Sequence, residues 1–443
     1  MDVAATTIVD RSDTHVVVGA GFVGLGMMAA LRRAGIPVEG FESDDDLGGN
    51  WYHGVYETVH IISSRKTTQY GDWPMPSDWP DFPSKDQMLT YLRGYAEHHD
   101  LRRSIRFSTP VAWIEPEADG RWLVRLESGE TRRYGGVIVA IGHHWDRRWP
   151  QYPGERTVEL IHSKDYKRPD VLVGKRVLVI GGGNSACDIA VEAARFASHA
   201  AISLRRGYWF LPKTVYGVPL IEMIKPWMPP AVQRRLVKAA ARVAFGPYER
   251  YGLPTPDHEP LEHHPTINSE LLYFIKHGRI HVRPDIARWH GNDIEFTDGR
   301  REHYDLVVAA TGYHLRVPFV PSDVVPVKDE IPQLIAGVLP EHYKNFYFTS
   351  FGQPRYGAGP LITAGAHALV ALIRAQAKMQ HPIGAVLRRL GERPPVTALA
   401  DPFEMMRRSA RAVKMMPRIV ARETAIMRAS NRVQATMQLF SPF

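Results

Sequence analysis

Two short glycine-rich segments constrain the fold of this chain more than any other feature. Residues 16–24 read VVVGAGFVG and residues 177–188 read VLVIGGGNSACD, and each apolar run leads through glycines into a helical pattern. The motifs are G-x-G-x-x-G at Gly19, Gly21 and Gly24, and G-x-G-x-x-A at Gly181, Gly183 and Ala186. The first glycine allows a tight turn, the second lets backbone approach a pyrophosphate, and the third small residue packs helix on strand. One such run is weak evidence, but two predict two dinucleotide sites, most economically for a flavin and a nicotinamide nucleotide.

The single cysteine, Cys187, narrows the class of protein. It excludes an intramolecular disulfide and a redox-active C-x-x-C pair, so a disulfide reductase built on the same two nucleotide sites is excluded. A chain of 443 residues, 44% of them hydrophobic, is long enough for two domains with large cores. The first residues contain no basic segment followed by an apolar core, so we expect no secretory signal and a cytoplasmic protein.

The net charge of +8 is concentrated near the end of the sequence. Residues 401–443 carry eight basic residues against three acids. Such a segment can bind an anionic membrane surface or nucleic acid, but a solvated helix face is the commoner outcome and the one we favour. We expect no nucleic-acid partner, a helical tail, and an interruption of that helix at Pro417, because proline lacks the amide hydrogen.

The first nucleotide unit continues with a second predicted strand, residues 38–42, which ends in Glu42. This acid follows Gly24 by 18 residues, near the place where a carboxylate binds a ribose hydroxyl. Residues 48–51, GGNW, form a loop whose glycines can bring backbone close to a ligand. The long loop, residues 56–83, is rich in proline and aromatic residues, and a loop of this length in a compact domain is usually functional.

The second nucleotide unit ends its corresponding strand, residues 200–204, in basic rather than acidic residues. Arg205 and Arg206 follow it directly. A guanidinium suits a 2′-phosphate, so we expect NADPH rather than NADH, although an exposed basic turn is the alternative. Residues 208–265, rich in Pro, Trp and Tyr, are interpreted as an excursion over the mouth of the site. The spacing of His258, His263 and His264 matches no metal-ligand pattern, so we expect no metal.

Taken in order, these motifs resemble the flavin-containing monooxygenases, class B enzymes that use FAD and NADPH. The matching segments are GAGFVG, Glu42, GGNW, DWPMP at 72–76, IGGGNSACDIA at 180–190, LRRG at 204–207 and AATGY at 309–313. The resemblance covers roughly residues 15–380. The family fingerprint F-x-G-x-x-x-H-x-x-x-Y appears loosely as Tyr152, Gly154, His162 and Tyr166, with Tyr in place of Phe and a longer gap between Gly and His.

The resemblance implies an α/β fold of two Rossmann-like dinucleotide-binding domains, with the NADPH domain inserted into the FAD domain and a C-terminal helical extension. We expect the FAD domain at 1–168 and 305–395, the NADPH domain at 169–304, and the basic helical tail at 396–443. The residues expected to bind cofactor are Gly19, Ala20, Gly21, Phe22, Gly24, Glu42, Asn50, Trp51, Val111, Gly181, Gly183, Asn184, Ser185, Ala186, Arg205, Arg206, Thr311 and Gly312.

The activity implied is transfer of one oxygen atom from O2, through a C4a-peroxyflavin, to a soft nitrogen or sulfur nucleophile of a small organic substrate. The cofactors supply the chemistry, and the protein supplies orientation, dryness and hydrogen bonds. Tyr166 stands where the related Baeyer–Villiger enzymes usually have Trp, which favours heteroatom oxygenation over ketone oxygenation. The sequence leaves the substrate and the oligomeric state open.

One position departs from the family pattern. Many members carry an Asn followed by a small hydroxyl residue near the reactive edge of the flavin, and these two positions fall on Ile62 and Ser63 here. Ile cannot donate a hydrogen bond, so the candidate donor is Ser63 or, as an alternative, Ser64. Two alternatives therefore stay open: a Baeyer–Villiger ketone monooxygenase, and an uncoupled NADPH oxidase or flavin-binding protein.

Overall fold

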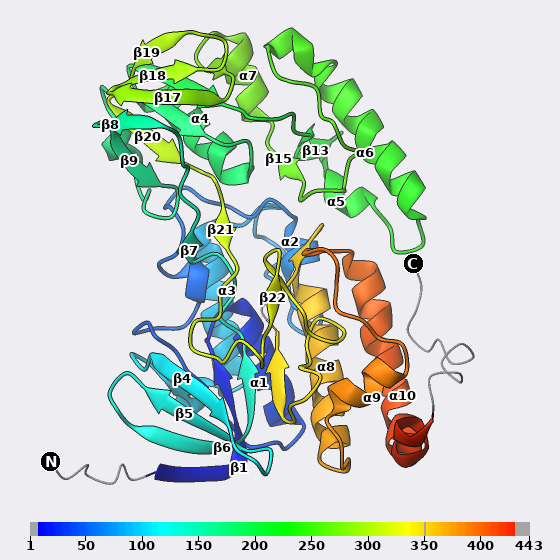
Figure 1. Ribbon diagram of the computed structural model, residues 1–443. Coiled ribbons are helices and arrows are strands. Elements are labelled where there is room, and N and C mark those ends of the chain that lie inside the picture. The colour runs from blue at the N-terminus through cyan, green and yellow to red at the C-terminus, as the bar shows by residue number, and fades with distance from the viewer. Residues whose placement is uncertain (1–7, 350, 430–443) are drawn as a thin grey trace, which may run out of the picture.

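The chain forms two lobes, each built on its own parallel β-sheet (Figure 1). A computed structural model describes residues 8–349 and 351–429. The first lobe carries the N-terminal glycine run and the C-terminal helices, and the second lobe carries the other glycine run. This arrangement is the two-unit α/β fold that the repeated glycine motif predicts.

The sheet of the first lobe has parallel strands at its centre and an antiparallel hairpin at one side. Its strand order is β3-β2-β1-β6-β5-β4, with β24 also paired to β6. The strands are β1 Ile8–Val18, β2 Val38–Phe41, β3 Ile105–Arg106, β4 Val111–Pro116, β5 Trp122–Leu126, β6 Thr131–Val139 and β24 Phe346–Phe348. Successive residues of β1 point to opposite faces, so Val17 joins the core under the helices while Val16 and Val18 join the core under the hairpin.

Helices pack in layers on one face of this sheet. They are α1 Phe22–Arg33, α3 Lys85–His98, α8 Gly359–Gln376, α9 Ile383–Arg389 and α10 Pro402–Arg428. Of these, α9 and α10 lie against α8. Ser84 starts α3 with a capping box, in which its hydroxyl accepts from the Gln87 amide and the Gln87 side chain accepts from the Ser84 amide. Short helical turns lie at η1 Gly49–Trp51, α2 Arg65–Thr68 and η2 Arg102–Ser104.

The second lobe is built on the strand order β16-β11-β10-β20-β9, all parallel. The strands are β9 Glu159–His162, β10 Arg176–Ile180, β11 His199–Ser203, β16 His281–Arg283 and β20 Leu306–Ala309, with η3 Pro169–Leu172, α4 Asn184–Phe196 and α7 Glu270–Lys276 packed around them. A second sheet combines β8 Gly154–Arg156, β17 Ile286–Gly291, β18 Asp293–Phe296 and β19 Arg301–His303. Because β9 and β20 belong to this lobe, its sheet extends beyond the predicted limits 169 and 304 on both sides.

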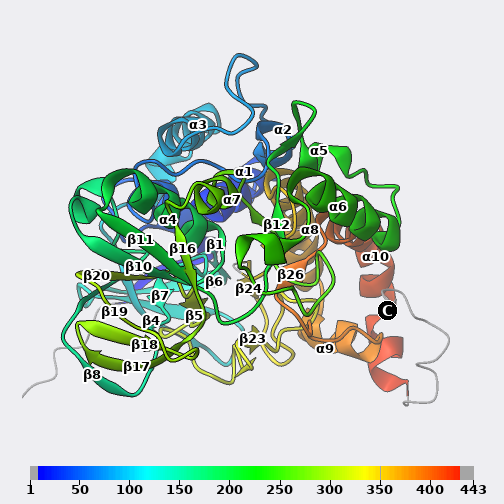
Figure 2. The ribbon, with the colours of Figure 1, turned by 90° about the horizontal axis from the view of Figure 1, so that it is seen from above.

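Residues 208–265 leave the second lobe and extend over α8 and α10 (Figure 2). This excursion contains β12 Phe210–Leu211, β13 Thr214–Val215, β14 Val218–Pro219, α5 Leu220–Met223, α6 Pro230–Phe245 and η4 Tyr248–Tyr251, and β12 pairs with β15 Thr266–Ile267. The Tyr356 hydroxyl donates to Gln233 Oε1 over 2.5 Å, with both side chains buried, and Arg407 of α10 donates to the Pro226 carbonyl. The excursion is therefore anchored to the first lobe.

The two connections between the lobes run side by side. β7 Asp146–Arg147 pairs antiparallel with β21 Tyr313–His314, at the waist between the lobes in Figure 1. Two further small pairs lie nearby: β22 Val327–Lys328 with β23 Ile331–Pro332, and β25 Gln353–Pro354 with β26 Leu399–Ala400. The chain thus enters and leaves the second lobe at one place.

The predicted helical tail is confirmed over α10, and the predicted interruption at Pro417 is wrong. The helix runs through this exposed proline, because Met416 and Ile419 are buried beside it and anchor both flanking turns. Packing of an apolar helix face can outweigh the roughly 3 kcal/mol that an interior proline costs.

The exposed face of α10 is basic. It carries Arg411, Lys414 and Arg418, as a solvated basic face requires. The rest of the predicted tail, 430–443, lies outside the described residues. Among the described helices, none has the length and apolar character needed to cross a bilayer.

Candidate functional site

The first glycine run forms the turn between β1 and α1. Gly19 has φ +102°, and its amide donates to the Phe41 carbonyl of β2 over 2.8 Å. A Cβ built on Gly19 would lie 2.6 Å from the Ala140 carbonyl oxygen, and one built on Gly24 would lie 1.9 Å from the Gly19 carbonyl oxygen. Neither position has space for a side chain, so helix α1 packs directly on the backbone of the turn.

The second glycine run repeats this geometry between β10 and α4. Gly181 has φ +124°, its amide donates to the Ser203 carbonyl of β11 over 3.1 Å, and a Cβ on it would lie 2.4 Å from the Ala310 carbonyl oxygen. Ala186 takes the place of Gly24, and its Cβ lies 3.7 Å from the position that a Cβ on Gly181 would occupy, an ordinary contact distance. The two turns therefore use the same backbone geometry.

The middle glycines differ from the others, because the space in front of them is open. A Cβ on Gly21 would meet its nearest neighbour, Gly49 Cα, only at 3.6 Å, and a Cβ on Gly183 would meet nothing within 4 Å. Both have negative φ, −81° and −80°, and serve as N-caps of α1 and α4 without any side-chain cap. Two helix N-termini with free space before them suit two pyrophosphate groups, so the residues fit the predicted dinucleotides.

Glu42 closes the first site. It is buried, and its Oε2 accepts from the Ala20 amide over 2.7 Å while Oε1 accepts from the Ser43 hydroxyl and the Asp44 amide at 3.1 Å. The carboxylate is thus fixed beside the glycine run, where it retains lone pairs for a ribose hydroxyl. Phe22 starts α1 and packs on Tyr70, and Val111 starts β4, paired with Leu126.

The structure offsets Arg205 and Arg206 from the place that corresponds to Glu42. Ser203 occupies the position equivalent to Phe41, because the carbonyl of each accepts from the first glycine of its run. The residue that follows, and so corresponds to Glu42, is therefore the buried Leu204. Arg205 and Arg206 are exposed just beyond it, and neither forms an ion pair within the described chain. Arg206 lies 5.3 Å from the Tyr208 ring, which in turn fills the space beside Gly182. A leucine offers nothing to a ribose hydroxyl, whereas two arginines offer charge to a phosphate.

The GGNW loop lies against the first glycine run. The Gly48 amide donates to the Ala20 carbonyl over 3.0 Å, Gly49 has φ +53°, and Trp51 packs on the helical core. Lys164 of the other lobe reaches this loop, donating to Asn50 Oδ1 and to the His144 carbonyl, each over 2.9 Å. Burial lowers the pKa of Lys164 to about 8, and the neighbouring Lys167 and Arg147 act in the same direction. No local sequence signal marks Lys164, because its two acceptors, Asn50 and His144, are 114 and 20 positions away in the sequence.

The other predicted cofactor residues take part in hydrogen bonds within the protein. Asn184 accepts from the Ile267 amide over 2.8 Å and donates to the Pro265 carbonyl over 3.1 Å, so its side chain fastens the excursion to the start of α4. Ser185 and Ala186 form the first turn of α4. The Thr311 hydroxyl donates to the Arg148 carbonyl, and the Gly312 carbonyl accepts from the Arg148 amide and from Nε2 of the buried His162. Thr311 and Gly312 thus hold the crossing connections together.

The long loop passes between the starts of α1 and α8. The Tyr70 hydroxyl donates to the Phe22 carbonyl over 2.5 Å, and a Cβ on Gly359 would lie 2.0 Å from the Gln69 carbonyl oxygen. Ile62 packs against the apolar cluster of the excursion, and the Ser63 hydroxyl lies 2.6 Å from that of Thr68. Either hydroxyl can donate, so Ser63 keeps its proton for another acceptor when Thr68 is the donor.

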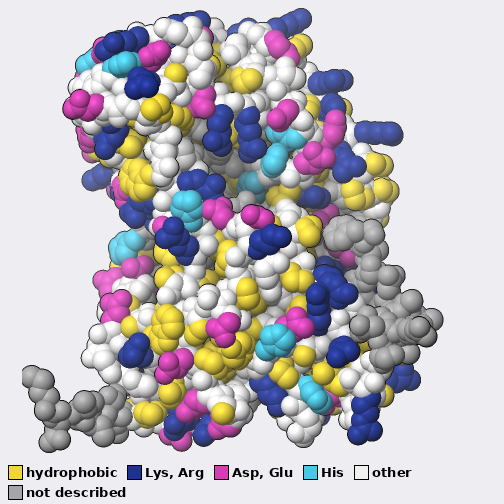
Figure 3. Space-filling view, in the orientation of Figure 1, with side chains coloured by type: hydrophobic (Ala, Val, Ile, Leu, Met, Phe, Trp, Pro, Cys, Tyr) yellow, Lys and Arg dark blue, Asp and Glu magenta, His cyan; other side chains and the backbone are white. Residues whose placement is uncertain are grey.

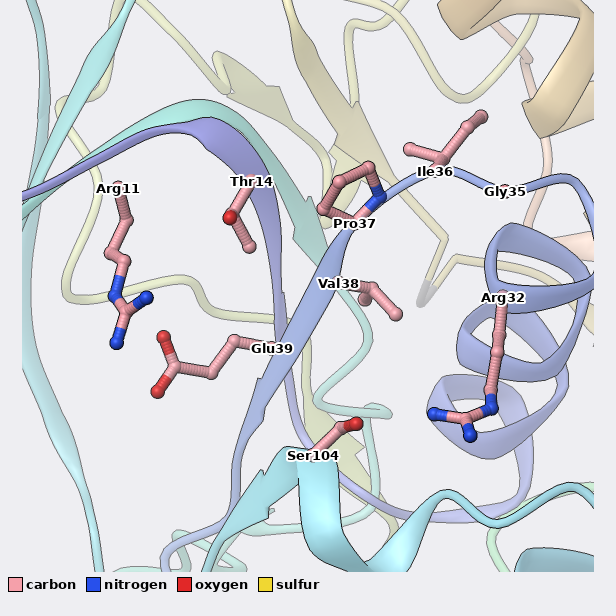
Figure 4. Close-up of a pocket in the computed structure, with 9 residues that line it drawn as sticks. All are labelled: Arg11, Thr14, Arg32, Gly35, Ile36, Pro37, Val38, Glu39 and Ser104. Carbon is pink, nitrogen blue, oxygen red and sulfur yellow. The ribbon is translucent and has the colours of Figure 1, made fainter.

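The surface is hollowed near the crossing connections and again far from them. Figure 3 shows a hollow between the two lobes with Lys, Arg and His side chains at its rim. A pocket of about 340 Å³ lies beside the crossing connections and is lined by residues such as His143, Arg148, Tyr313 and Gln353. Another, of about 420 Å³, lies at the opposite ends of β1 and β2, where Arg11 points toward Glu39 (Figure 4). The second pocket is remote from both glycine runs. Within the described chain, no group of His, Cys, Asp and Glu side chains is arranged to hold a metal.

Comparison with known proteins gives consistent matches. The family model described as flavin-binding monooxygenase-like matches residues 13–359. Human flavin-containing monooxygenase 5 is 33% identical over 345 residues, which cover 71% of this chain and 64% of that protein. Rice indole-3-pyruvate monooxygenase YUCCA1 is 30% identical over 315 residues, 68% of this chain and 77% of the relative. The chain thus spans less than two thirds of the human relative.

Solved structures share the fold at lower identity. Cyclohexanone monooxygenase from Rhodococcus sp. Phi1 bound to NADP+ superposes with a TM-score of 0.71 at 16% identity, over 92% of this chain and 98% of that one. The flavin-containing monooxygenase from Stenotrophomonas maltophilia gives a TM-score of 0.61 at 21% identity, over 84% of this chain and 100% of that one. Both likenesses concern the fold.

The open space at Gly21 and the closed space at Gly24 predict different responses to one added methyl group. Gly24→Ala should lower the free energy of unfolding by about 2 kcal/mol or more, because the methyl group meets backbone that cannot rotate away. Gly21→Ala should change it by less than about 0.5 kcal/mol. Thermal and denaturant unfolding of the two variants checks this. Equal stability of both would contradict the packing of α1 on the turn.

Proposed function

The chain belongs to the flavin-binding monooxygenase-like family, and on that premise we propose that it is an FAD- and NADPH-dependent monooxygenase that transfers one oxygen atom from O2 to a nitrogen or sulfur atom of a small organic substrate. The observation that carries the proposal is the pair of open glycine positions, Gly21 and Gly183, each at a helix N-terminus on a tight Rossmann turn. Two dinucleotides in one chain, without a cysteine pair, suit flavin reduction followed by reaction with O2.

The residues of the first lobe would hold FAD. Gly19, Gly21 and Gly24 would bring backbone to its pyrophosphate, and Glu42 would accept from its ribose. The second glycine run and Arg205–Arg206 would hold NADPH in the same manner, with the arginines on the 2′-phosphate. When bound, this flavin reduced by NADPH supplies the activation of O2 and the transfer of one oxygen atom.

The protein itself would supply position and dryness. The excursion lies over the start of α8, and its apolar cluster includes buried Leu211, Leu220 and Ile221 with Ile62 packed against it. Such a covering excludes water from the reacting centre. Lys164 would keep the GGNW loop of the first lobe aligned with the second lobe, because its ammonium group reaches from the end of β9 to Asn50 and to the His144 carbonyl.

The first test is product analysis with sulfides, tertiary amines and ketones in the presence of NADPH and O2. We expect an S-oxide or N-oxide from at least one of the first two classes, with part of the NADPH consumed yielding hydrogen peroxide instead, and no ester from ketones. Gly21→Val should purify without flavin, while Gly183→Val should keep its flavin and lose NADPH oxidation, since each valine fills only one cradle.

Three results would contradict this assignment. Ester formation would establish the Baeyer–Villiger alternative, and hydrogen peroxide as the sole product would establish an uncoupled oxidase. Full flavin content in Gly21→Val would show that the first glycine run is not the flavin site.

Arg205 and Arg206 should set the preference for NADPH over NADH. A charge-assisted hydrogen bond to phosphate contributes roughly 1.5–3 kcal/mol, so Arg205→Gln or Arg206→Gln should lower the ratio of kcat/KM for NADPH to that for NADH by about tenfold or more. Arg300→Gln, an exposed arginine of the same lobe paired with Asp298, is the matched control and should leave the ratio unchanged. Equal kcat/KM for both nucleotides in the parent enzyme would overturn the proposal.

Ile62 and Ser63 should control how much NADPH oxidation yields product rather than hydrogen peroxide. Ile62 keeps water out but donates no hydrogen bond, and a missing donor at a charged centre costs about 1 kcal/mol or more. We propose that Ser63 supplies part of that donation. Ile62→Asn should therefore lower the peroxide formed per NADPH, and Ser63→Ala should raise it several-fold.

The control for this pair is Ser77→Ala, which removes an exposed hydroxyl of the same loop and should leave the peroxide yield unchanged. A Ser63→Ala enzyme with the parent's peroxide yield would show that this part of the loop does not handle oxygen.

A further inference from the structure

Two carboxylates on α4 are bonded to hydroxyl groups from outside their own helix. Glu192 is 5% exposed, and its two oxygens accept from the Thr58 hydroxyl and the Tyr166 hydroxyl. One turn earlier, Asp188 accepts from the Tyr56 hydroxyl and from the Asn268 amide, each over 2.8 Å. Within the described chain, no Lys or Arg forms an ion pair with either acid. The side-chain hydrogen bonds to the two carboxylates therefore come from these hydroxyl and amide groups.

The donors come from segments far apart in sequence. Tyr56 and Thr58 begin the long loop of the first lobe, and Tyr166 ends the fingerprint segment. The rings of Tyr56 and Tyr166 lie 5.8 Å apart, and Tyr56 is buried in the core of the second lobe. Burial together with the Glu192 carboxylate raises the pKa of Tyr166, and burial together with Asp188 raises the pKa of Tyr56, so both phenols keep their protons and remain donors.

The same loop is fixed to the first lobe a few residues later. The Tyr70 hydroxyl donates to the Phe22 carbonyl at the start of α1, and the Gly71 amide donates to the Thr363 hydroxyl of α8 over 2.9 Å. Ile62 and Ser63 lie between these two attachments. Meanwhile α4 begins directly at the second glycine run, with Gly183 as its N-cap. A shift of α4 would therefore move the first attachment of the loop but not the second.

We propose that Asp188 and Glu192 form a clasp, with Tyr56, Thr58 and Tyr166, through which nucleotide binding at the second glycine run fixes the position of residues 58–64. Asp188 and Glu192 are positioning residues in this device, because they act through the loop rather than on reacting atoms. The inference rests on the proposed function only in taking NADP+ as the nucleotide. The clasp also gives the terminal tyrosine of the fingerprint a physical role, since Phe there would leave a buried Glu192 oxygen without its donor.

The clasp is tested by hydrogen exchange of the full-length protein as purified, without added nucleotide. Thr58→Val keeps the shape of Thr58 but removes its hydroxyl group, and Tyr56→Phe keeps the ring but removes its hydroxyl group. Each should speed amide exchange in residues 56–68 by about tenfold, because a bond to a charged group no longer opposes local opening. Thr58→Ser should restore the parent rate. The matched control is Tyr304→Phe, which removes a hydroxyl group that donates to Glu302 from a buried tyrosine within the second lobe. Parent-like exchange in both test variants would overturn the clasp.

The link to the nucleotide is tested by adding NADP+. In the parent protein, exchange should slow in residues 181–188 and also in residues 56–68. In Thr58→Val and Tyr56→Phe, only the protection of residues 181–188 should remain. Retained protection of residues 56–68 in the variants would overturn the link. An absence of protection at 181–188 in the parent would instead contradict NADP+ as the ligand of this run, and the nucleotide-free comparison would still decide the clasp.

Discussion

Both lobes depend on close contact between a helix and a strand turn, with no side chain between them in the first lobe and only the methyl group of Ala186 in the second. At Gly24 the helix lies so close to the Gly19 carbonyl that a Cβ would fall 1.9 Å from its oxygen, and at Gly19 the turn lies against the Ala140 carbonyl. This contact fixes where each helix begins and aims its amide groups into open space. The acid beside one run and the arginines beside the other are useful only because the strands that carry them are hydrogen-bonded to those turns.

The long loop joins the two copies of this arrangement. Its first residues are buried in the core of the second lobe, and its middle is held between α1 and α8 of the first. Hydroxyl groups on carboxylates and carbonyls attach it, together with ion pairs such as Arg168 with Glu57, and hydrogen-bond geometry defines the directions of the hydroxyl contacts. The loop between the attachments has little freedom to move unless one lobe moves with it.

The sequence predicted the features that are local. Glycine spacing and the acid at the end of the second strand each depend on residues a few positions apart, and the structure has both in place. It could not predict the pairs made across the fold, such as Lys164 with Asn50 or Tyr166 with Glu192, because only the folded chain brings them together. The helix continues through Pro417 for the same reason, since its packing partners lie on α8. The offset of Arg205 from Glu42 was also hidden, because strand register is set by hydrogen bonds and not by counting.

The antiparallel pair of β7 and β21 has a consequence for how such a protein could arise. Because the chain leaves the first lobe and returns to it through neighbouring strands, the whole second lobe is, topologically, one long insertion in a surface connection. Insertions at such points leave the strand order of the host unchanged, and closing even a very long loop adds little entropic cost once its ends are held together. An insertion between β6 and β24 therefore gives this architecture without rearranging the sheet of the first lobe.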